Sequence, residues 1–155
     1  RTFQLLVQVA GRAGRGDRSG EVVVQTFLPH APTLQYARKT DYNGFVEEEL
    51  GHRKQCGYPP YRHLIAHLFR APSVEKLEFY CEAWAKEVSK NIPQIEIRGP
   101  TPAPIERIEN LYRYQIWYLC DDAEATVKKI TALRENFVFD KDIIDSMDVD
   151  ATHLI

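Results

Sequence analysis

Two arginines set one helical turn apart among glycines are the residues best suited to chemistry in this chain. The stretch QVAGRAGR, residues 8–15, places Arg12 and Arg15 three positions apart, so that both guanidinium groups can point into one crevice. Guanidinium binds phosphate oxygens in pairs and stays charged, while Gly11 and Gly14 let backbone approach a ligand closely. The pattern predicts contact with a polyphosphate, where an arginine from a second surface can speed phosphoryl transfer roughly a thousandfold or more.

Three other interpretations of this segment are weaker or less specific. A solvated basic turn would also explain the charge. A dinucleotide-binding G-x-G-x-x-G needs a strand before it and a helix after it, and here the order is reversed. Arg15-Gly16-Asp17 matches an adhesion tripeptide, but three residues match by chance. The sequence contains no G-x-x-x-x-G-K-[ST] phosphate loop, so we expect this chain alone not to hydrolyse ATP.

The elements that must position the arginines form the first part of the chain. Helical spacing of apolar residues predicts a helix over 3–12, and β-branched residues predict a buried strand over 21–27. Two further helices are expected over 33–40 and 43–56, the second with Phe45, Val46 and Leu50 facing inward. The sequence YPPY, residues 58–61, then interrupts the pattern. We expect one domain over 1–57 and another over 58–155.

The second part of the sequence predicts two β-α-β units in succession. Strands are expected over 62–70, 95–98, 111–120 and 142–149, with a helix capped by Ser73 and another over 122–135 opened by Asp121 or Asp122. A proline-rich loop, residues 99–104, joins the two units. This order predicts an α+β, split ferredoxin-like fold, with helices on one face of an antiparallel sheet. The other face must meet water or a partner.

Aromatic residues and arginines on and near strand 111–120 are candidate contacts for nucleic acid or protein. Alternation puts Tyr112, Tyr114, Ile116 and Tyr118 on one side and Arg113, Gln115, Trp117 and Leu119 on the other. Both sides are partly aromatic, so the alternation leaves open which side is core. Rings beside guanidinium groups can stack on unpaired bases, although the same pattern also fits ordinary sheet packing. The candidate contact residues are Arg98, Arg107, Arg113, Tyr114 and Trp117.

Charge and composition narrow the class of protein. Hydrophobic residues make up 44% of the 155 residues and the formal net charge is −2. Residues 1–62 carry nine Lys and Arg against six Asp and Glu, whereas residues 63–155 carry eleven against sixteen. The acidic second part opposes nonspecific attraction to phosphates, so any DNA contact there must be local. Three scattered cysteines without C-x-x-C spacing predict no metal site, and no apolar run is long enough to cross a membrane.

A resemblance to a known family joins these features. Residues 8–26, QVAGRAGRGDRSGEVVVQT, resemble the sixth conserved motif of superfamily-two helicases. The stretches 42–49, YPPY at 58–61, GPTPAPIERIENLYRYQ at 99–115 and DVD at 148–150, with Arg53 and Gly57, resemble in order the C-terminal end of the primosomal protein N-prime family. The resemblance spans essentially the whole chain. The chain also begins at Arg1, within an expected helix, so we expect it to belong to a longer protein.

The resemblance implies an ATP-dependent, 3′-to-5′ DNA helicase that recognises stalled forks and restarts replication through primosome assembly. Residues 1–57 would end its second RecA-like lobe, and 58–155 would form a C-terminal domain similar to a ribosomal protein. Arg15 would approach the γ-phosphate, Arg12 would accompany it, and Gln8 would couple nucleotide to lobe closure. ATP and Mg would be held mainly by an upstream lobe, with zinc also upstream and no cofactor bound by this chain alone.

The implied partners are branched and single-stranded DNA, single-stranded DNA-binding protein and other primosome proteins, in the bacterial cytoplasm at the nucleoid, with no membrane contact. One departure from the family is Ala151, where the family usually has proline after Asp150. Two alternatives stay open: a stand-alone ferredoxin-like module that binds nucleic acid or protein without motor activity, and a purely structural assembly domain.

Overall fold

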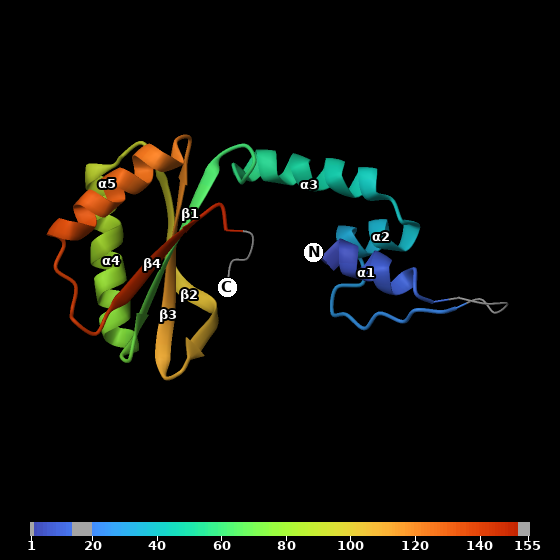
Figure 1. The fold of residues 1–155 in the computed structure, drawn as a ribbon, viewed down its shortest axis with the longest axis horizontal. Coiled ribbons are helices and arrows are strands. Elements are labelled where there is room, and N and C mark those ends of the chain that lie inside the picture. The colour runs from blue at the N-terminus through green and yellow to red at the C-terminus, as the bar shows by residue number, and fades with distance from the viewer. Residues whose placement is uncertain (1, 14–19, 152–155) are drawn as a thin grey trace. The chain divides into compact units, whose positions relative to one another are not determined.

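A computed structural model describes residues 2–13 and 20–151 of the chain (Figure 1). The chain separates into two compact units, Arg1–Gln55 and Cys56–Ile155. We call them the first and second unit and describe each by itself.

The described part of the first unit contains helices at the three predicted places. They are α1 (Thr2–Ala10), α2 (Pro32–Lys39) and α3 (Tyr42–Cys56), the last ending at the unit boundary. Proline occupies the first position of α2, where a missing N–H costs nothing. Asp41 precedes α3, and its carboxylate accepts a 2.9 Å hydrogen bond from the Gly44 N–H, as an N-cap does.

Aromatic stacking holds α1 against α3. Phe3 is buried, and its ring stacks on Phe45 with 4.7 Å between centroids and lies 5.8 Å from Tyr42. The prediction that Phe45, Val46 and Leu50 face inward holds only in part. All three are half-buried, and α3 has no fully buried residue, because few described elements pack against it.

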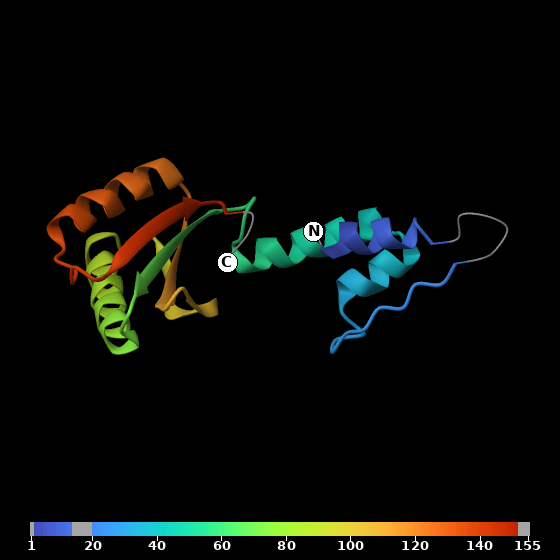
Figure 2. The same cartoon turned by 60° about the horizontal axis from the view of Figure 1, so that its bottom comes forward.

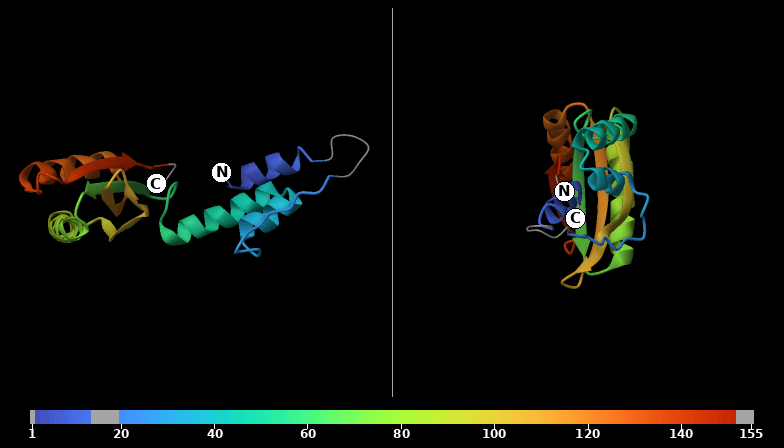
Figure 3. Two further views of the ribbon diagram at one scale, coloured as in Figure 1. Left: turned by 90° about the horizontal axis from the view of Figure 1, so that it is seen from below. Right: turned by 90° about the vertical axis from the view of Figure 1, so that its right-hand side faces the viewer.

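The strand predicted over 21–27 is wrong for this structure. Residues 20–26 run without regular secondary structure back past α1 (Figure 3). The described part of the chain offers this segment no neighbouring strand, and β-propensity makes a strand only where a neighbour supplies the ladder of hydrogen bonds. The assignment of this unit to a RecA-like lobe stays a prediction.

The second unit has the predicted split β-α-β order. Its elements are β1 (His63–Ala71), α4 (Val74–Asn91), β2 (Glu96–Ile108), β3 (Leu111–Cys120), α5 (Ala123–Asn136) and β4 (Ile144–Val149). Over the described residues the strands form one sheet in the order β2-β3-β1-β4, with each neighbouring pair antiparallel. Both helices of this unit lie on the same face of the sheet (Figure 2), which confirms the predicted α+β arrangement.

Local sequence fixes where these two helices begin. The Ser73 hydroxyl accepts from the Lys76 N–H at 3.2 Å, and the Asp122 carboxylate accepts from the Ala125 N–H at 2.9 Å. These N-caps satisfy otherwise unpaired backbone groups. The apolar sides of the helices then bury against the sheet, and the largest fully buried residues of the core include Trp84, Tyr118, Phe69, Ile65 and Leu77.

The proline-rich stretch 99–104 lies within β2 and does not form the loop that the sequence predicts. The pairing of β2 with β3 continues through it, with shifts of register between Arg98 and Thr101 and between Pro102 and Arg107. Strand β2 is an edge of the sheet, where prolines without N–H groups and bulges are tolerated. The prediction of a loop failed because the amino-acid composition of a segment does not show where the segment lies in a sheet.

A buried polar network lies within the covered side of the sheet. His67 is fully buried, with Nε2 3.0 Å from an Asp145 carboxylate oxygen and Nδ1 3.1 Å from the Tyr118 hydroxyl. The Trp84 indole N–H donates to the same hydroxyl at 2.8 Å. These distances fit a neutral imidazole that donates to Asp145 and accepts from Tyr118, so the described polar groups satisfy one another.

Candidate nucleotide and nucleic-acid sites

The predicted polyphosphate contacts that the structure describes gather at the end of α1. Gln8 is exposed on the last turns of the helix, and Gly11 and Arg12 follow in the turn that closes it. The Arg12 N–H donates to the Val9 carbonyl at 3.1 Å, which prolongs the helical path. Gln8 and Arg12 are four residues apart and therefore share a side. Gly14 and Arg15 lie outside the described residues.

The Arg12 side chain is exposed and available to a ligand. Among the described residues it makes neither a hydrogen bond nor an ion pair with a carboxylate, although its backbone is fixed. An exposed guanidinium group without a partner keeps all five of its N–H donors for an anion. This is what the proposed polyphosphate contact requires of Arg12.

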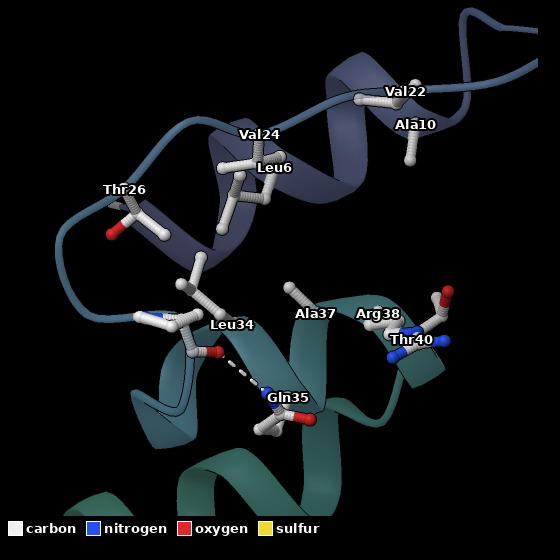
Figure 4. A pocket seen from close by; sticks show the side chains of 11 residues that line it. Leu6, Ala10, Val22, Val24, Thr26, Leu34, Gln35, Ala37, Arg38 and Thr40 are labelled. Atoms are coloured by element: carbon white, nitrogen blue, oxygen red, sulfur yellow. Dashed lines mark hydrogen bonds between the residues drawn. The ribbon is translucent and has the colours of Figure 1, made fainter.

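The first unit also contains a pocket of about 400 Å³, drawn in Figure 4. Leu6, Val24 and Leu34 from three different segments form much of its wall, and the Gln35 side chain donates to the Pro29 carbonyl at 2.9 Å. Its wall mixes apolar side chains with Gln35 and Arg38, and neither Gln8 nor Arg12 lines it. The pocket is therefore separate from the predicted polyphosphate contacts.

In the second unit, the strands present one face that neither α4 nor α5 covers. We call it the open face, and define it on the two central strands by the side chains of Leu64, Ala66, Leu68, Arg70, Arg113, Gln115, Trp117 and Leu119. These residues alternate with those of the core, and they pair across β1 and β3 in the register Leu64–Leu119, Ala66–Trp117, Leu68–Gln115 and Arg70–Arg113.

The open face brings together Arg98, Arg113 and Trp117 of the predicted contact set. Arg98 on β2 lies directly opposite Trp117 on β3, and directly opposite residues project on the same side. Arg113 precedes Trp117 by four residues on β3 and so shares its side. Three predicted residues from two strands thus lie on one side of the sheet.

Arg98 is already engaged by its neighbours. Its guanidinium group donates to Glu96 at 2.8 Å and to the Cys56 carbonyl at 3.0 Å, and it lies over the Tyr58 ring at 4.9 Å. The pairing with Glu96 raises the pKa of Arg98, and Arg98 in turn lowers the pKa of the Glu96 carboxyl. Arg98 thus ties β2 to Cys56 and to Tyr58 of the YPPY segment, which weakens its candidacy as a DNA contact.

Arg113 is engaged as well, whereas the indole N–H of Trp117 is not. Arg113 is only 6% exposed, and its guanidinium group donates to the Ile105 carbonyl at 3.2 Å. Trp117 is half-buried, and its indole N–H is inaccessible and has no hydrogen-bond partner among the described residues. A buried donor without a partner costs about 1–3 kcal/mol, so the open face carries an unmet demand for an acceptor.

Arg107 and Tyr114 lie apart from the open face. Tyr114 packs against the core on the helix-covered side, and burial is the main cause that raises its pKa. Arg107 pairs with Tyr112 across the β2–β3 hairpin, lies over that ring at 4.9 Å and donates to the Asn110 side chain. The structure therefore does not bring these two residues together with Trp117.

Arg70 is a candidate that the sequence prediction missed. It lies on β1 directly opposite Arg113, it is half-buried, and its Nε is inaccessible and has no hydrogen-bond partner among the described residues. Its only sequence signal is an arginine within an apolar strand. Only the fold shows that β1 pairs with β3 and so places this arginine opposite Arg113.

Two classes of site find no support in the described residues. No group of three or more His, Cys, Asp or Glu side chains there is arranged to hold a metal ion. No helix of the described chain is long and apolar enough to cross a membrane.

The split β-α-β sheet, with helices on one side and arginines with tryptophan on the other, defines a two-layer α+β domain. Residues 54–151 match the family model described as the primosomal protein N C-terminal domain. The chain belongs to this family, which confirms the resemblance inferred from its motifs.

Curated relatives extend the similarity beyond this domain. The chain is 40% identical over 117 residues to "Replication restart protein PriA" of Synechocystis sp., covering 75% of this chain and 14% of the relative. The proteins of that name from Bacillus subtilis and Thermotoga maritima are 35% identical over 153 residues and 38% identical over 132. These matches cover 96% and 84% of this chain but only 19% and 17% of the relatives.

Among solved structures, "De novo designed protein Foldit4" has a TM-score of 0.45 and 16% identity, covering 59% of this chain and 99% of that chain.

Proposed function

We propose that this chain is the C-terminal portion of an ATP-dependent, 3′-to-5′ DNA helicase that recognises stalled forks and restarts replication through primosome assembly. The observation that carries the proposal is the family match over residues 54–151. Relatives named as replication restart proteins, similar over up to 96% of this chain, support it further. Because the chain spans only 14–19% of these relatives, the motor itself would lie largely in other polypeptide.

In this proposal the first unit contributes to ATP hydrolysis. Arg15 stabilises the charge that develops on the γ-phosphate of ATP, with Arg12 beside it and Gln8 coupling the nucleotide to lobe closure. ATP and Mg are held mainly by an upstream lobe, since this sequence has no phosphate loop. The exposed, unpaired guanidinium group of Arg12 among the described residues supports this role.

The second unit contributes the contacts with DNA and partners. Branched and single-stranded DNA, single-stranded DNA-binding protein and other primosome proteins are the ligands we propose. The sheet face opposite α4 and α5 carries Arg70, Arg113 and Trp117, and this supports a binding role because an aromatic ring with guanidinium groups is a combination that binds unpaired bases.

A strand-displacement assay on the full-length protein tests the helicase proposal. The substrates are partial DNA duplexes with either a 3′ or a 5′ single-stranded tail, and a fork that combines both. ATP-dependent unwinding of the 3′-tailed duplex and of the fork is expected, with little unwinding of the 5′-tailed duplex. Absence of unwinding on every substrate at saturating ATP and Mg would contradict the proposal.

A stand-alone binding module is the second candidate function. It is favoured by the core of the second unit, in which Trp84, Tyr118 and Phe69 are fully buried. This candidate requires tight binding of fork DNA by the 155-residue chain, falling steeply with salt. The helicase proposal expects weaker fork binding by the chain than by the full-length protein. Equal affinities would favour the module.

A further inference from the structure

We infer that the free edge of β4 binds an extended, lysine- or arginine-bearing segment of a partner protein as an added strand of the sheet. Strand β4 ends the sheet order β2-β3-β1-β4, so β1 is its only neighbouring strand among the described residues. The inference goes beyond the proposed function and does not rest on it, because it depends only on the chemistry of the sheet edge.

The two edges of the sheet differ in their capacity to accept a further strand. Strand β2 contains Pro100, Pro102 and Pro104, which have no backbone N–H, and its register shifts twice along β3. Prolines and bulges are devices that keep an edge from pairing. Strand β4 contains neither proline nor glycine and pairs with β1 without a shift from Ile144 to Val149. Of the two edges, β4 is therefore the regular one.

Alternate residues of β4 direct their backbone groups toward this edge. The Asp150 N–H donates to the Leu64 carbonyl at 2.7 Å. In an antiparallel pair, hydrogen-bonded positions alternate with positions whose N–H and C=O groups point away from the partner strand. In the register of β1 with β4, Asp145, Met147 and Val149 belong to the second set. Their backbone groups form the ladder that an added strand would complete.

The side chains of β4 offer apolar contacts on both sides of the edge. Ile144 is 50% exposed and Val149 is 42% exposed. Ile144 lies opposite Arg70 and so on the side of the open face, whereas Val149 lies opposite the core residue Ile65 on the helix-covered side. An extended segment can cover both, because successive side chains of a strand point to opposite faces.

Charge on β4 favours a basic partner. Asp148 lies opposite Ala66 and is exposed, and among the described residues its side chain forms neither a hydrogen bond nor an ion pair. Asp145, by contrast, is already paired with His67 and Arg134. A lysine or arginine directly opposite Asp148 would stabilise the added strand, whereas a like charge would destabilise it.

A second copy of this chain is a poorer occupant than a basic segment. Strand β4 has the sequence IDSMDV, which contains two aspartates and neither lysine nor arginine. Two β4 strands side by side would bring together the aspartates of both without a basic side chain between them. The acidic residues thus act against self-association of this edge, and a strand of opposite charge is left as the occupant.

Amide hydrogen exchange followed by NMR tests the site with the 155-residue chain. The probe is a peptide of about eight residues with blocked ends, in which valine and threonine alternate and one central threonine is replaced by lysine. In the free chain, the N–H groups of Asp145, Met147 and Val149 should exchange faster than those of Ser146 and Asp148. Saturating peptide should slow the exchange of the first three by about tenfold or more, because an added strand gives them acceptors.

Charge selectivity provides the second readout. The same peptide with glutamate in place of lysine should bind about fivefold more weakly, since a repulsive cross-strand pair replaces an attractive one. Asp148→Lys should reverse this preference. Glu135→Lys is the matched control, because it makes the same charge reversal at an exposed position of α5, and it should keep the preference for lysine. Val149→Pro, which removes an edge-facing N–H, should weaken binding more than Val149→Thr, which keeps it.

Unchanged exchange of the β4 amides with either peptide would overturn the inference, as would the same peptide preference in wild type and Asp148→Lys. A dimer that sedimentation detects and that Val149→Pro dissociates would make a second copy the occupant and also overturn it. A melting temperature for each variant identifies misfolding, and the two peptides compared on the wild-type chain then remain decisive. Failure of this inference leaves ATP-dependent unwinding by the full-length protein untouched.

Discussion

Arg70 on β1 and Arg113 on β3 are directly opposite each other on the face of the sheet that neither α4 nor α5 covers. Arg70 has a buried Nε that lacks a hydrogen-bond partner within the described chain, whereas Arg113 donates to the Ile105 carbonyl at 3.2 Å. A buried donor without a partner costs about 1–3 kcal/mol of folding free energy.

Replacing Arg70 by leucine should therefore stabilise the second unit. Arg70→Leu removes the unsatisfied donor while keeping an aliphatic side chain, so the free energy of unfolding should rise by about 1 kcal/mol. Urea unfolding followed by tryptophan fluorescence measures the effect. Lys129→Leu, on an exposed helical position, should change stability by less than about 0.5 kcal/mol.

The stability of the second unit should decrease in mild acid because of His67. Burial lowers the pKa of His67 below its usual 6.5 despite the nearby Asp145 carboxylate, so the unfolded chain takes up a proton that the folded chain resists. The stabilisation is complete above pH 6.5 and is lost as the pH falls through the folded pKa. The free energy of unfolding should decrease from pH 7 to pH 5.

A neutral replacement isolates this contribution. His67→Gln can keep a donor toward Asp145 and an acceptor toward Tyr118, and it should flatten the decrease between pH 7 and pH 5. His52→Gln, exposed on α3, should leave it intact. An unchanged decrease between pH 7 and pH 5 in His67→Gln would show that His67 is not its cause.

A second decrease in the free energy of unfolding is expected between pH 3.8 and about 2, since the hydrogen bond from His67, helped by Arg134, lowers the pKa of Asp145 to about 2.

Arg98 should contribute to the stability of the second unit. Arg98→Ala removes the contacts with Glu96, the Cys56 carbonyl and the Tyr58 ring, and we expect the free energy of unfolding to fall by about 1–2 kcal/mol. Urea unfolding measures the loss. An unchanged free energy of unfolding in Arg98→Ala would contradict this role.

Gly99 should be intolerant of a side chain. Its φ is +98°, and an added Cβ would lie 2.7 Å from the backbone carbonyl oxygen of Gln115 on the neighbouring strand. Gly99→Ala should destabilise the second unit by about 2 kcal/mol or more. Gly51→Ala, in the middle of α3 with open space around it, should increase helix stability by up to about 1 kcal/mol. Thermal unfolding by circular dichroism compares the two.

Local signals predicted most elements because those elements depend on local physics. Ser73 and Asp122 begin α4 and α5 as the sequence indicates, and β3 has its predicted bounds. The prediction of a strand around Val23 failed because a strand needs a neighbour that the described chain does not provide. The prediction of a loop around Pro102 failed because an edge strand tolerates prolines.

The candidate sites were predictable only where their residues are close in sequence. Arg12 and Gln8 share a helix end, so their spacing was informative. The open face depends on the register of β1 with β3, and no local pattern pairs Arg70 with Arg113. Strict alternation separated Tyr114 from Trp117, but the positions of α4 and α5 decided which of them faces the core.

The contribution of Arg15 to ATP hydrolysis is the most direct test of the proposed motor function. ATP binding and DNA-stimulated hydrolysis are measured on the full-length protein as wild type, Arg15→Ala, Arg12→Ala and Arg18→Ala, the last being an arginine outside the motif. We expect near-normal ATP binding and a loss of hydrolysis of roughly a thousandfold in Arg15→Ala, a smaller loss in Arg12→Ala and wild-type rates in Arg18→Ala. Wild-type hydrolysis by Arg15→Ala would contradict the account.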